Sequence, residues 1–184
     1  MEKLLGVVMC GGQSQRMGTD KGLIKQGDAT WAQLIFNKLK QFNIPVVVSI
    51  NPTQTATYSS IFNATDLVTD AMDIPGPLNG ILSVHASYPN NDLLILACDM
   101  IDMDYPTLKQ LVDIQTTDSG YNYYAYNNGE FFEPLCALYT ARGLNTISQT
   151  GLSNYSLQTV LNNGNTKRLE ITNAKAFKNQ NNRE

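Results

Sequence analysis

A glycine-rich segment near the start of the chain has the residue types that bind phosphate groups. Gly11 and Gly12 follow a run of apolar residues, and Arg16, Lys21 and Lys25 come soon after them. Because glycine has no side chain, consecutive backbone N–H groups can turn toward an anion and approach it closely. The three basic side chains could then balance the charge of a triphosphate. The segment contains neither GxxxxGK[ST] nor GxGxxG, so a plain turn between a strand and a helix is the alternative.

Polar side chains also follow three other apolar runs. Asp99 ends a run of six apolar residues, Asp70 follows a shorter run, and Asn51 follows a run rich in valine. Carboxylate oxygens are the ligands that Mg²⁺ prefers, and a magnesium ion held beside phosphate groups uses only one or two protein carboxylates. Asp99 is therefore a candidate metal ligand, with a cap of the following turn as the alternative. Asp70 could share the metal or hold the ribose or base of a nucleotide, or it could be an ordinary loop residue.

Other ionisable residues in the chain are interpreted as structural. Asp102 and Asp104 are assigned to turns and helix caps, since Asp104 precedes Tyr105-Pro106 as an N-cap residue does. His85 is the single histidine and is interpreted as a packed or surface residue. A Ser/His/Asp triad and a zinc site are therefore excluded.

The elements that would position these side chains alternate along the chain. Residues 4–10 are continuously apolar, as in a parallel strand covered by helices on both faces. Residues 30–42 carry apolar side chains at steps of three and four, which is typical of an amphipathic helix. Further strands are expected at residues 45–50, 67–69, 93–98, 121–126, 131–139 and 167–171. Residues 75–87 are expected to begin with a Pro-Gly-Pro turn and to become helical around Leu78. Further helices are expected at residues 105–116, 142–149 and 153–161.

This alternation predicts a three-layer α/β/α sandwich around a mostly parallel, Rossmann-like sheet, formed by residues 1–184 as one domain. The Asn-Asn-Gly turn at residues 127–129 predicts a hairpin inserted at the sheet edge. All strands of a parallel sheet end at the same side, and ligands bind in the crevice there. The spacing therefore predicts that the glycine segment, Asn51, Asp70 and Asp99 lie together.

Length and charge exclude several classes of protein. The chain has 184 residues, 42% of them hydrophobic, which is enough for a core without metal or disulfide crosslinks and excludes disorder of the whole chain. The net charge of −3 divides into +3 for residues 1–40, −10 for residues 41–136 and +4 for residues 137–184. No segment combines the basic and aromatic residues of a nucleic-acid groove, so no nucleic-acid partner is expected.

The cysteines and the first apolar run indicate the compartment. Cys10, Cys98 and Cys136 are far apart and odd in number, which fits neither a CxxC metal site nor a closed disulfide framework. Buried, reduced thiols are expected. The first apolar run, interrupted by Gly6, is too short for a signal segment or a membrane span. We therefore expect a cytoplasmic protein with no membrane partner.

Residues 7–21, VVMCGGQSQRMGTDK, resemble the LAGGxSxRMGxDK signature of the molybdenum cofactor guanylyltransferases, within the wider nucleotidyltransferase superfamily. Three later segments support the resemblance in the family's order: residues 75–80, PGPLNG, residues 96–100, LACDM, and residues 133–139, EPLCALY. The resemblance covers nearly the whole chain and implies a sheet of the nucleotide-diphospho-sugar transferase type. It also implies transfer of GMP from GTP to molybdopterin, the molybdenum cofactor, with release of pyrophosphate.

The resemblance implies a role for each matching residue. Lys21 would reach the phosphates of GTP, Arg16 would be a second phosphate partner, and Asp99 would bind Mg²⁺; these three residues would form the catalytic group. Asp70 would contact the nucleotide. The residues that would line the guanine nucleotide are Met9, Cys10, Gly11 and Gly12.

The chain departs from the family pattern at three places. Cys10 replaces the usual alanine, which is a change between small side chains. Ser49 stands where some relatives have asparagine, which leaves Asn51 as the expected nucleotide-binding amide of that loop. Residues 177–184 resemble the family's F-x-N-x-N-T-P-E segment, on the side that receives molybdopterin, but lack its Thr-Pro. The five basic residues of the segment 167–183 could dock the pterin phosphate.

Rival functions share the same fold. The paired glycines Gly11-Gly12, where related cytidylyl-transferring enzymes tend to have Ala-Gly, favour GTP over CTP. A CTP-dependent molybdopterin cytidylyltransferase and a sugar-phosphate nucleotidyltransferase are the enzyme alternatives. A GTP-binding accessory protein without catalysis is the alternative from another class. The expected partners are GTP, molybdopterin and other proteins of cofactor biosynthesis or molybdoenzyme maturation.

Overall fold

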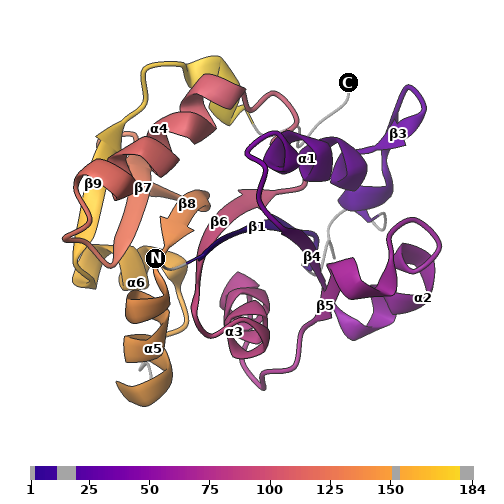
Figure 1. Cartoon of the computed structure of the whole chain (residues 1–184), viewed down its shortest axis with the longest axis horizontal. Helices are drawn as coiled ribbons and strands as arrows, with labels where there is room; N and C mark the ends of the chain where they lie inside the picture. The colour runs from indigo at the N-terminus through magenta and orange to yellow at the C-terminus, as the bar shows by residue number, and fades with distance from the viewer. Residues whose placement is uncertain (1–2, 12–19, 151–153, 179–184) are drawn as a thin grey trace.

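A seven-stranded sheet forms the centre of the molecule (Figure 1). The computed structural model describes residues 3–11, 20–150 and 154–178. The strands of this sheet are β1 (Lys3–Met9), β4 (Val46–Ile50), β5 (Leu67–Thr69), β6 (Asn91–Ala97), β7 (Tyr123–Asn127), β8 (Phe132–Tyr139) and β9 (Thr166–Glu170). They lie in the order β5-β4-β1-β6-β8-β7-β9, and every neighbouring pair is parallel except the two that include β8. The sheet is therefore mostly parallel, as the sequence predicts.

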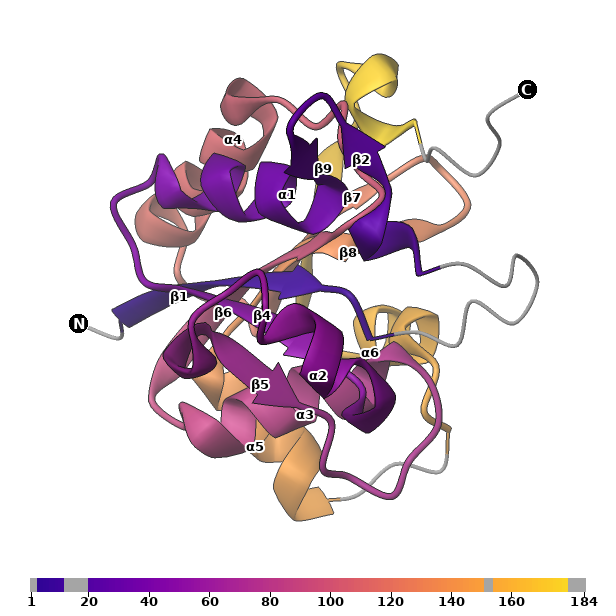
Figure 2. The same cartoon turned by 90° about the vertical axis from the view of Figure 1, so that its right-hand side faces the viewer.

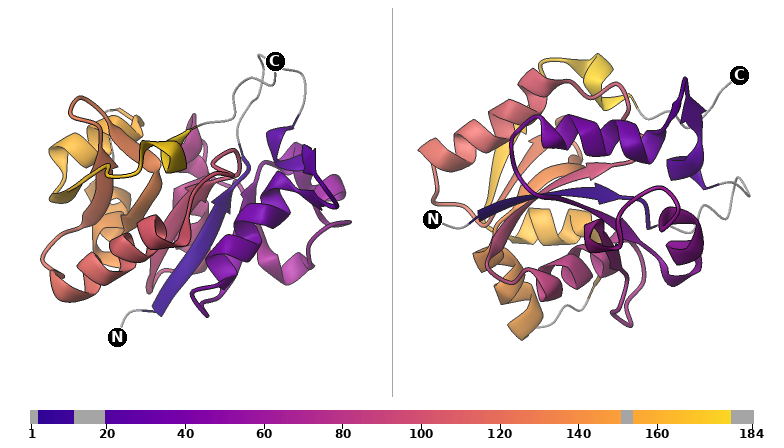
Figure 3. Two further views of the ribbon diagram at one scale, coloured as in Figure 1. Left: turned by 90° about the horizontal axis from the view of Figure 1, so that it is seen from above. Right: turned by 45° about the vertical axis from the view of Figure 1, so that its right-hand side comes forward.

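Helices cover both faces of this sheet. The α-helices are α1 (Trp31–Lys40), α2 (Thr55–Tyr58), α3 (Pro77–Ser87), α4 (Tyr105–Thr117), α5 (Ala141–Thr150) and α6 (Leu157–Asn163). The short 3₁₀ helices are η1 (Lys21–Leu23), η2 (Pro52–Gln54), η3 (Ala64–Asp66) and η4 (Ala174–Phe177), and β2 (Lys25–Gln26) pairs with β3 (Ala29–Thr30) in a small separate hairpin. The helices α1 and α4 lie on one face, and α3, α5 and α6 lie on the other (Figures 1 and 3). The predicted three-layer α/β/α sandwich is confirmed.

Each face of the sheet packs against its own apolar core. All five residues of β4 are buried. Val48 packs with Ile35 of α1 on one face, and Val47 packs with Ile81 of α3 on the other. Because successive side chains of a strand point to opposite faces, a strand between two helical layers must be apolar throughout. This requirement explains the continuous apolar runs of the sequence.

Local capping residues determine where two helices begin. The backbone N–H of Gln33 donates to Oγ1 of Thr30 at 3.3 Å, and the backbone N–H of Thr30 donates to Oε1 of Gln33 at 2.9 Å, which forms a capping box at the start of α1. At the start of α4, the backbone N–H of Thr107 donates to Oδ1 of Asp104 at 2.8 Å. The capping role predicted for Asp104 is confirmed.

The hairpin that was expected at the sheet edge lies inside the sheet instead. The β7–β8 turn forms as predicted, since Oδ1 of Asn127 accepts from the Gly129 N–H at 2.9 Å and Oδ1 of Asn128 accepts from the Phe131 N–H at 2.8 Å. However, β8 pairs with β6, and β9 pairs with β7 on the outer side. The edge prediction was wrong because turn residues indicate a hairpin but do not show where a later strand will pair. The helix expected from residue 153 begins at Leu157, and residues 151–153 lie outside the described residues.

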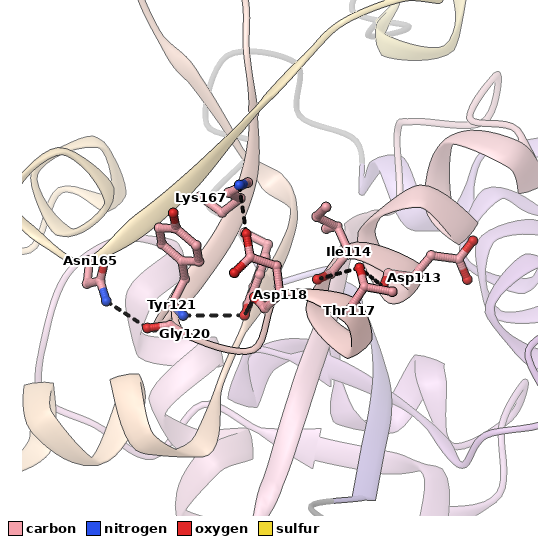
Figure 4. Close-up of polar contacts among 9 residues, drawn as sticks. Asp113, Ile114, Thr117, Asp118, Gly120, Tyr121, Asn165 and Lys167 are labelled. Carbon is pink, nitrogen blue, oxygen red and sulfur yellow. Dashed lines mark hydrogen bonds and ion pairs between the residues drawn. The ribbon is translucent and has the colours of Figure 1, made fainter.

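Polar contacts tie the end of α4 to β9 at the sheet edge opposite the strand carboxyl ends (Figure 4). The ammonium of Lys167 lies 2.8 Å from Oδ2 of Asp118, and the Tyr124 hydroxyl donates to the backbone oxygen of Asp118 at 2.7 Å. The amide Nδ2 of Asn165 donates to the backbone oxygen of Gly120 at 2.9 Å. These contacts fix the outer strand of the sheet against the helical layer.

The three cysteines and the single histidine are buried in the fold. Cys10, Cys98 and Cys136 are buried and free, as predicted. His85 is buried in α3, with Nε2 3.0 Å from Oδ1 of Asn145 in α5. In the part of the chain that the structure describes, no helix has both the length and the apolar character needed to cross a membrane.

Candidate functional site

The carboxyl ends of β1, β4, β5 and β6 lie together at one edge of the sheet (Figure 2). At this edge Met9 is in register with Ser49 of β4 and with Ala97 of β6. The residues that directly follow these four strands are Cys10, Asn51, Asp70 and Cys98. Side chains that are far apart in the sequence are therefore neighbours here, as the spacing predicts.

Lys21 and Asp99 form an ion pair at this edge. Lys21 opens η1, and Asp99 lies two residues beyond the end of β6. Nζ of Lys21 lies 2.9 Å from Oδ2 of Asp99, and the two side chains are only 22% and 17% exposed. Among the described residues, Oδ1 of Asp99 has no hydrogen-bond partner. In this arrangement the Lys21 ammonium can bind a phosphate group, and the Asp99 carboxylate can bind a metal ion that contacts the same phosphate.

A partly buried hydrogen-bond cluster holds Lys21 in place. Oδ1 of Asp20 accepts from the Gly22 N–H at 2.9 Å and from the Tyr58 hydroxyl at 3.0 Å. Oδ2 of Asp20 accepts from Nε2 of Gln54 at 2.6 Å, and the same Nε2 lies 3.1 Å from the backbone oxygen of Cys10. We name Asp20, Gln54 and Tyr58 the Asp20 cluster. It links the residue that follows β1 to the residue that precedes Lys21.

The Asp20 cluster leaves no room for a side chain at Gly22. A Cβ atom built on Gly22 would overlap the hydroxyl oxygen of Tyr58. Tyr58 is fully buried, and burial raises the pKa of its hydroxyl far above the ordinary value, so the hydroxyl stays protonated and donates to Asp20. The residue after Lys21 must therefore be glycine for the cluster to keep this packing.

Asp70 lies beside Ser49 and the backbone of Gly11. The hydroxyl of Ser49 lies 3.4 Å from Oδ1 of Asp70, and a Cβ on Gly11 would lie 3.1 Å from Oδ2. The backbone N–H groups of Cys10 and Gly11 both donate to the Ser49 backbone oxygen, at 2.9 and 3.0 Å. Burial raises the pKa of the half-buried Asp70 carboxyl, and the Ser49 hydrogen bond partly opposes this rise. This carboxylate is poised to accept hydrogen bonds from a ligand that replaces water.

Asn51 occupies a different position from Ser49. Oδ1 of Asn51 accepts from the Thr53 N–H at 2.9 Å and from the Thr53 hydroxyl at 2.6 Å, which caps η2. The Asn51 N–H donates to Oε1 of Gln54 at 2.8 Å. Ser49 therefore lies beside Asp70. The Asn51 side chain instead stabilises the turn from which Gln54 donates to Asp20.

The segment after Asp70 is fixed against α3. Nδ2 of Asn79 donates to the backbone oxygen of Met72 at 2.6 Å, and Oδ1 of Asn79 accepts from the Met72 N–H at 3.0 Å. A Cβ on Gly80 would collide with the Ser49 hydroxyl and would lie 2.8 Å from Cε of Met9. The motif PGPLNG at residues 75–80 therefore packs directly beneath the Asp70 side of the site.

The remaining residues that the sequence predicts for the site are Met9, Cys10, Gly12 and Arg16. The side chains of Met9 and Cys10 are buried, 5% and 7% exposed. Burial and a hydrogen bond with Cys98 raise the pKa of the Cys10 thiol, so it stays protonated. Gly12 and Arg16 lie outside the described residues.

The sequence did not predict that three further residues contribute to the site. Gln54 follows Asn51 by three positions, a capping-box spacing that signals the turn but not the contact with Asp20. Tyr58 has no local signal, because its partner Asp20 is 38 positions away. Ser49 was set aside as a departure from the family pattern, yet it faces Asp70.

Asp99 fits a magnesium ion that is shared with phosphate groups. Among the described residues, no group of three or more His, Cys, Asp or Glu side chains could hold a metal by itself. A magnesium site that is completed by phosphate oxygens and water needs only one or two carboxylates. The partly exposed Asp99 carboxylate next to Lys21 meets this requirement.

A known protein family matches most of the chain. Residues 6–169 match the family described as MobA-like NTP transferase domain. The chain belongs to this family. The match to the MobA-like domain spans the ends of all four strands at the carboxyl edge, and it includes Lys21, Asp70 and Asp99.

Individual relatives of this MobA-like domain carry related names. The chain is 33% identical over 141 residues to the "Molybdenum cofactor biosynthesis bifunctional protein" of Synechocystis sp., a match that covers 77% of the chain but 40% of that protein. It is 31% identical over 140 residues to the "Molybdenum cofactor guanylyltransferase" of Pseudomonas fluorescens, covering 74% of the chain and 67% of that protein. The chain therefore spans less than half the length of the Synechocystis relative.

A solved structure has the same fold. The molybdopterin-guanine dinucleotide biosynthesis protein A from Archaeoglobus fulgidus superposes with a TM-score of 0.71, covering 91% of this chain and 83% of that one, at 19% sequence identity. This similarity supports the predicted sheet of the nucleotide-diphospho-sugar transferase type.

Proposed function

We propose that this protein transfers GMP from GTP to the terminal phosphate of molybdopterin and releases pyrophosphate. The observation that carries the proposal is the Lys21–Asp99 pair, which joins the two groups expected to bind phosphate and metal. Membership of the MobA-like family supports it, as do the relatives named for molybdenum cofactor biosynthesis and guanylyl transfer.

Lys21 supplies positive charge where two anions must meet. In the proposed reaction, an oxygen of the acceptor phosphate forms a bond to the α-phosphorus of GTP, and the bond from that phosphorus to the pyrophosphate oxygen breaks. The protein must align the reactants and offset their repulsion. The ammonium of Lys21 lies at the carboxyl ends of the strands beside Asp99, and we propose that it binds the phosphate oxygens of GTP. Arg16 is proposed as a second phosphate partner.

Asp99 is the residue that we propose holds Mg²⁺. When bound, the ion neutralises phosphate charge and helps the pyrophosphate to leave. Asp99 contributes a hard oxygen ligand and keeps Lys21 oriented toward the same place. The Asp20 cluster maintains this orientation from the other side, because it holds the backbone on both sides of Lys21.

Asp70 and Ser49 are proposed to bind the nucleoside part of GTP. Both lie next to the backbone of Gly11, and the Asp70 carboxylate can accept from a hydroxyl or an amino group. Met9, Cys10, Gly11, Gly12 and Asn51 complete the proposed nucleotide site.

The proposed reaction needs no strong general base. An acceptor phosphate is already ionised at neutral pH, so it can attack without losing a proton to the protein. His85 is buried between α3 and α5, in contact with Asn145, and is assigned no catalytic role. The buried free cysteines agree with a reducing compartment, and we propose that the reaction takes place in the cytoplasm.

Loss of either charged group tests the proposal. We expect Lys21→Ala and Asp99→Ala each to lower pyrophosphate release from MgGTP in the presence of molybdopterin by roughly 10²-fold or more. Lys109→Ala is the matched control, because Lys109 forms an exposed ion pair with Asp113 on α4. Near-normal turnover of either site variant would refute the site assignment.

The choice of nucleotide is tested separately. Wild-type protein is incubated with molybdopterin and MgGTP, MgCTP or MgUTP, and the product is identified by mass. We expect the guanine dinucleotide. Preferential use of CTP would overturn the base assignment, and GTP binding with no GMP transfer would identify a non-catalytic binding protein.

A further inference from the structure

The segment that carries Asp70 lies at an outer edge of the sheet. The three-residue strand β5 is the outermost strand on this side, and it ends at Thr69, directly before Asp70. The Asp70 N–H donates to the backbone oxygen of Ile50 in β4 at 2.8 Å. Beyond this bond the chain leaves the sheet, and Ala71 and Asp73 are exposed. A segment with few buried contacts opens easily, so the position of the Asp70 carboxylate depends on what holds the residues after it.

Two side chains of α3 bind the backbone of this segment. Asn79 and Ser83 are four positions apart and therefore lie on the same face of the helix. The Ala71 N–H donates to the hydroxyl oxygen of Ser83 at 2.8 Å. The Met72 N–H donates to Oδ1 of Asn79 at 3.0 Å, and Nδ2 of Asn79 donates to the backbone oxygens of Met72, at 2.6 Å, and Ile74, at 3.2 Å. The chain after β5 is therefore tied to α3 through side chains.

Asn79 and Ser83 also orient each other. The Ser83 side chain is buried, and its hydroxyl donates to Oδ1 of Asn79 at 3.1 Å. Oδ1 of Asn79 thus accepts from two donors, while Nδ2 donates to two backbone oxygens. The amide cannot turn over without losing all of these bonds. The hydrogen-bonding groups of both side chains are directed to the protein rather than to the nucleotide site.

The first turns of α3 also contact the Asp70 carboxylate. A Cβ on Gly80 would lie 3.1 Å from Oδ1 of Asp70, and a Cβ on Gly11 would lie 3.1 Å from Oδ2. The half-buried carboxylate is therefore enclosed between the backbone of the glycine segment and α3. The bonds from Asn79 and Ser83 to the residues just after Asp70 keep this arrangement closed.

We propose that Asn79 and Ser83 are positioning residues for the nucleotide, which act through Asp70 by holding the chain after it so that the carboxylate faces the nucleoside part of GTP. The inference rests on the proposed function, in which Asp70 binds the nucleoside. A carboxylate that is already fixed loses less freedom when the ligand binds, so its affinity is higher. Because the nucleoside is remote from the bonds that change, this contribution is the same in the ground state and the transition state. Its loss raises KM for GTP and leaves kcat unchanged.

A double-mutant cycle with Asp70 tests this role. The variants are Asn79→Ala, Ser83→Ala and Asp70→Ala, together with the double variants that combine Asp70→Ala with each of the other two. Affinity for MgGTP is measured by calorimetry, and urea unfolding establishes that each variant is folded. Ser87→Ala is the matched control, because the exposed Ser87 hydroxyl donates to the Ser83 backbone oxygen in the last turn of the same helix.

We expect Asn79→Ala to weaken MgGTP binding roughly 10-fold and to raise KM by the same factor, with kcat changed by less than about 2-fold. Ser83→Ala should act in the same direction with a smaller loss, because water can reach the Ala71 N–H. In the Asp70→Ala background, either substitution should change the affinity by less than about 2-fold. A merely structural role would give the same loss in both backgrounds. Ser87→Ala should bind MgGTP as wild type does.

The outcomes separate this inference from the proposed function. Equal losses with and without the Asp70 carboxylate, or wild-type affinity in both Asn79→Ala and Ser83→Ala, overturn the positioning role even if GMP transfer is observed. A loss that requires the Asp70 carboxylate supports the positioning role, even if the transfer assay shows no product and the proposed reaction fails. Absence of MgGTP binding by wild type overturns both, since Asp70 would then have no nucleoside to bind.

Discussion

Gly22→Ala is expected to destabilise the protein by placing a methyl group against the hydroxyl of Tyr58. A Cβ on Gly22 would overlap that oxygen, whereas the next nearest atoms, in Asp20 and Cys10, lie at 3.3 Å. Tyr58 is fully buried and hydrogen-bonded to Asp20, so it cannot move aside without breaking the Asp20 cluster. Overpacking of this kind costs about 1–3 kcal/mol.

Removing the hydroxyl should relieve the collision. Tyr58→Phe alone loses one hydrogen bond to a carboxylate, at a cost of about 1–3 kcal/mol, while Asp20 keeps its bonds from Gly22 and Gln54. In the double variant, the alanine methyl occupies the space of the missing oxygen. The double variant should therefore be about as stable as Tyr58→Phe alone, and the coupling free energy should equal the penalty of Gly22→Ala, about 1–3 kcal/mol.

Urea unfolding measures these free energies through the fluorescence of Trp31, the single tryptophan, which is buried in α1. Pyrophosphate release from MgGTP should follow the same order of variants, because Gly22 is adjacent to Lys21. Gly120→Ala is the control, since no atom lies within 4 Å of its Cβ position. If the costs of Gly22→Ala and Tyr58→Phe add to within about 0.5 kcal/mol, the collision does not exist and the reasoning is refuted.

Three further changes test other parts of the fold and site. Burial raises the pKa of Asp70 in the folded protein, so the folded state holds its proton more tightly than the unfolded chain, and the free energy of unfolding should fall as pH rises from the ordinary to the raised pKa. Asp70→Asn should abolish that pH dependence in urea titrations and lower GTP affinity; an unchanged pH profile would contradict the buried position of the carboxyl. Thr30→Ala removes the capping box with Gln33 and should cost about 1 kcal/mol in the same unfolding assay, with no change in nucleotide affinity. Gly80→Ala places a methyl group on the Ser49 hydroxyl and should weaken GTP binding measured by calorimetry, whereas wild-type affinity would show that this packing does not support the site.

Features that depend on short stretches of sequence could be predicted. The continuous apolar runs predicted strands covered on both faces, because each face of a central strand must meet a helix. The Asp104 cap and the Asn-Asn-Gly turn were also correct, since their hydrogen bonds join residues two or three positions apart. The parallel order of the strands then brought Lys21 and Asp99 to one edge, as expected.

The choice between Ser49 and Asn51 could not be made from the strand pattern. The two residues are two positions apart, so both lie on the same face of an extended strand. Asn51 is drawn into capping η2 because the strand ends there and the chain turns, and this leaves Ser49 beside Asp70. The hydrogen bonds that Asn51 makes within the turn therefore determine which of the two residues lies beside Asp70, and these bonds depend on the course of the backbone after β4.

The sequence by itself determined the fold class, the strand ends that carry glycine and carboxylate groups, and the motifs that identify the MobA-like family. Only the tertiary structure decided how Gln54 and Tyr58 hold Asp20 and where the β7–β8 hairpin lies in the sheet. The physical reason is range. Period and capping act over a few residues, whereas these contacts join segments 34 or more positions apart, whose meeting depends on the packing of the whole sheet.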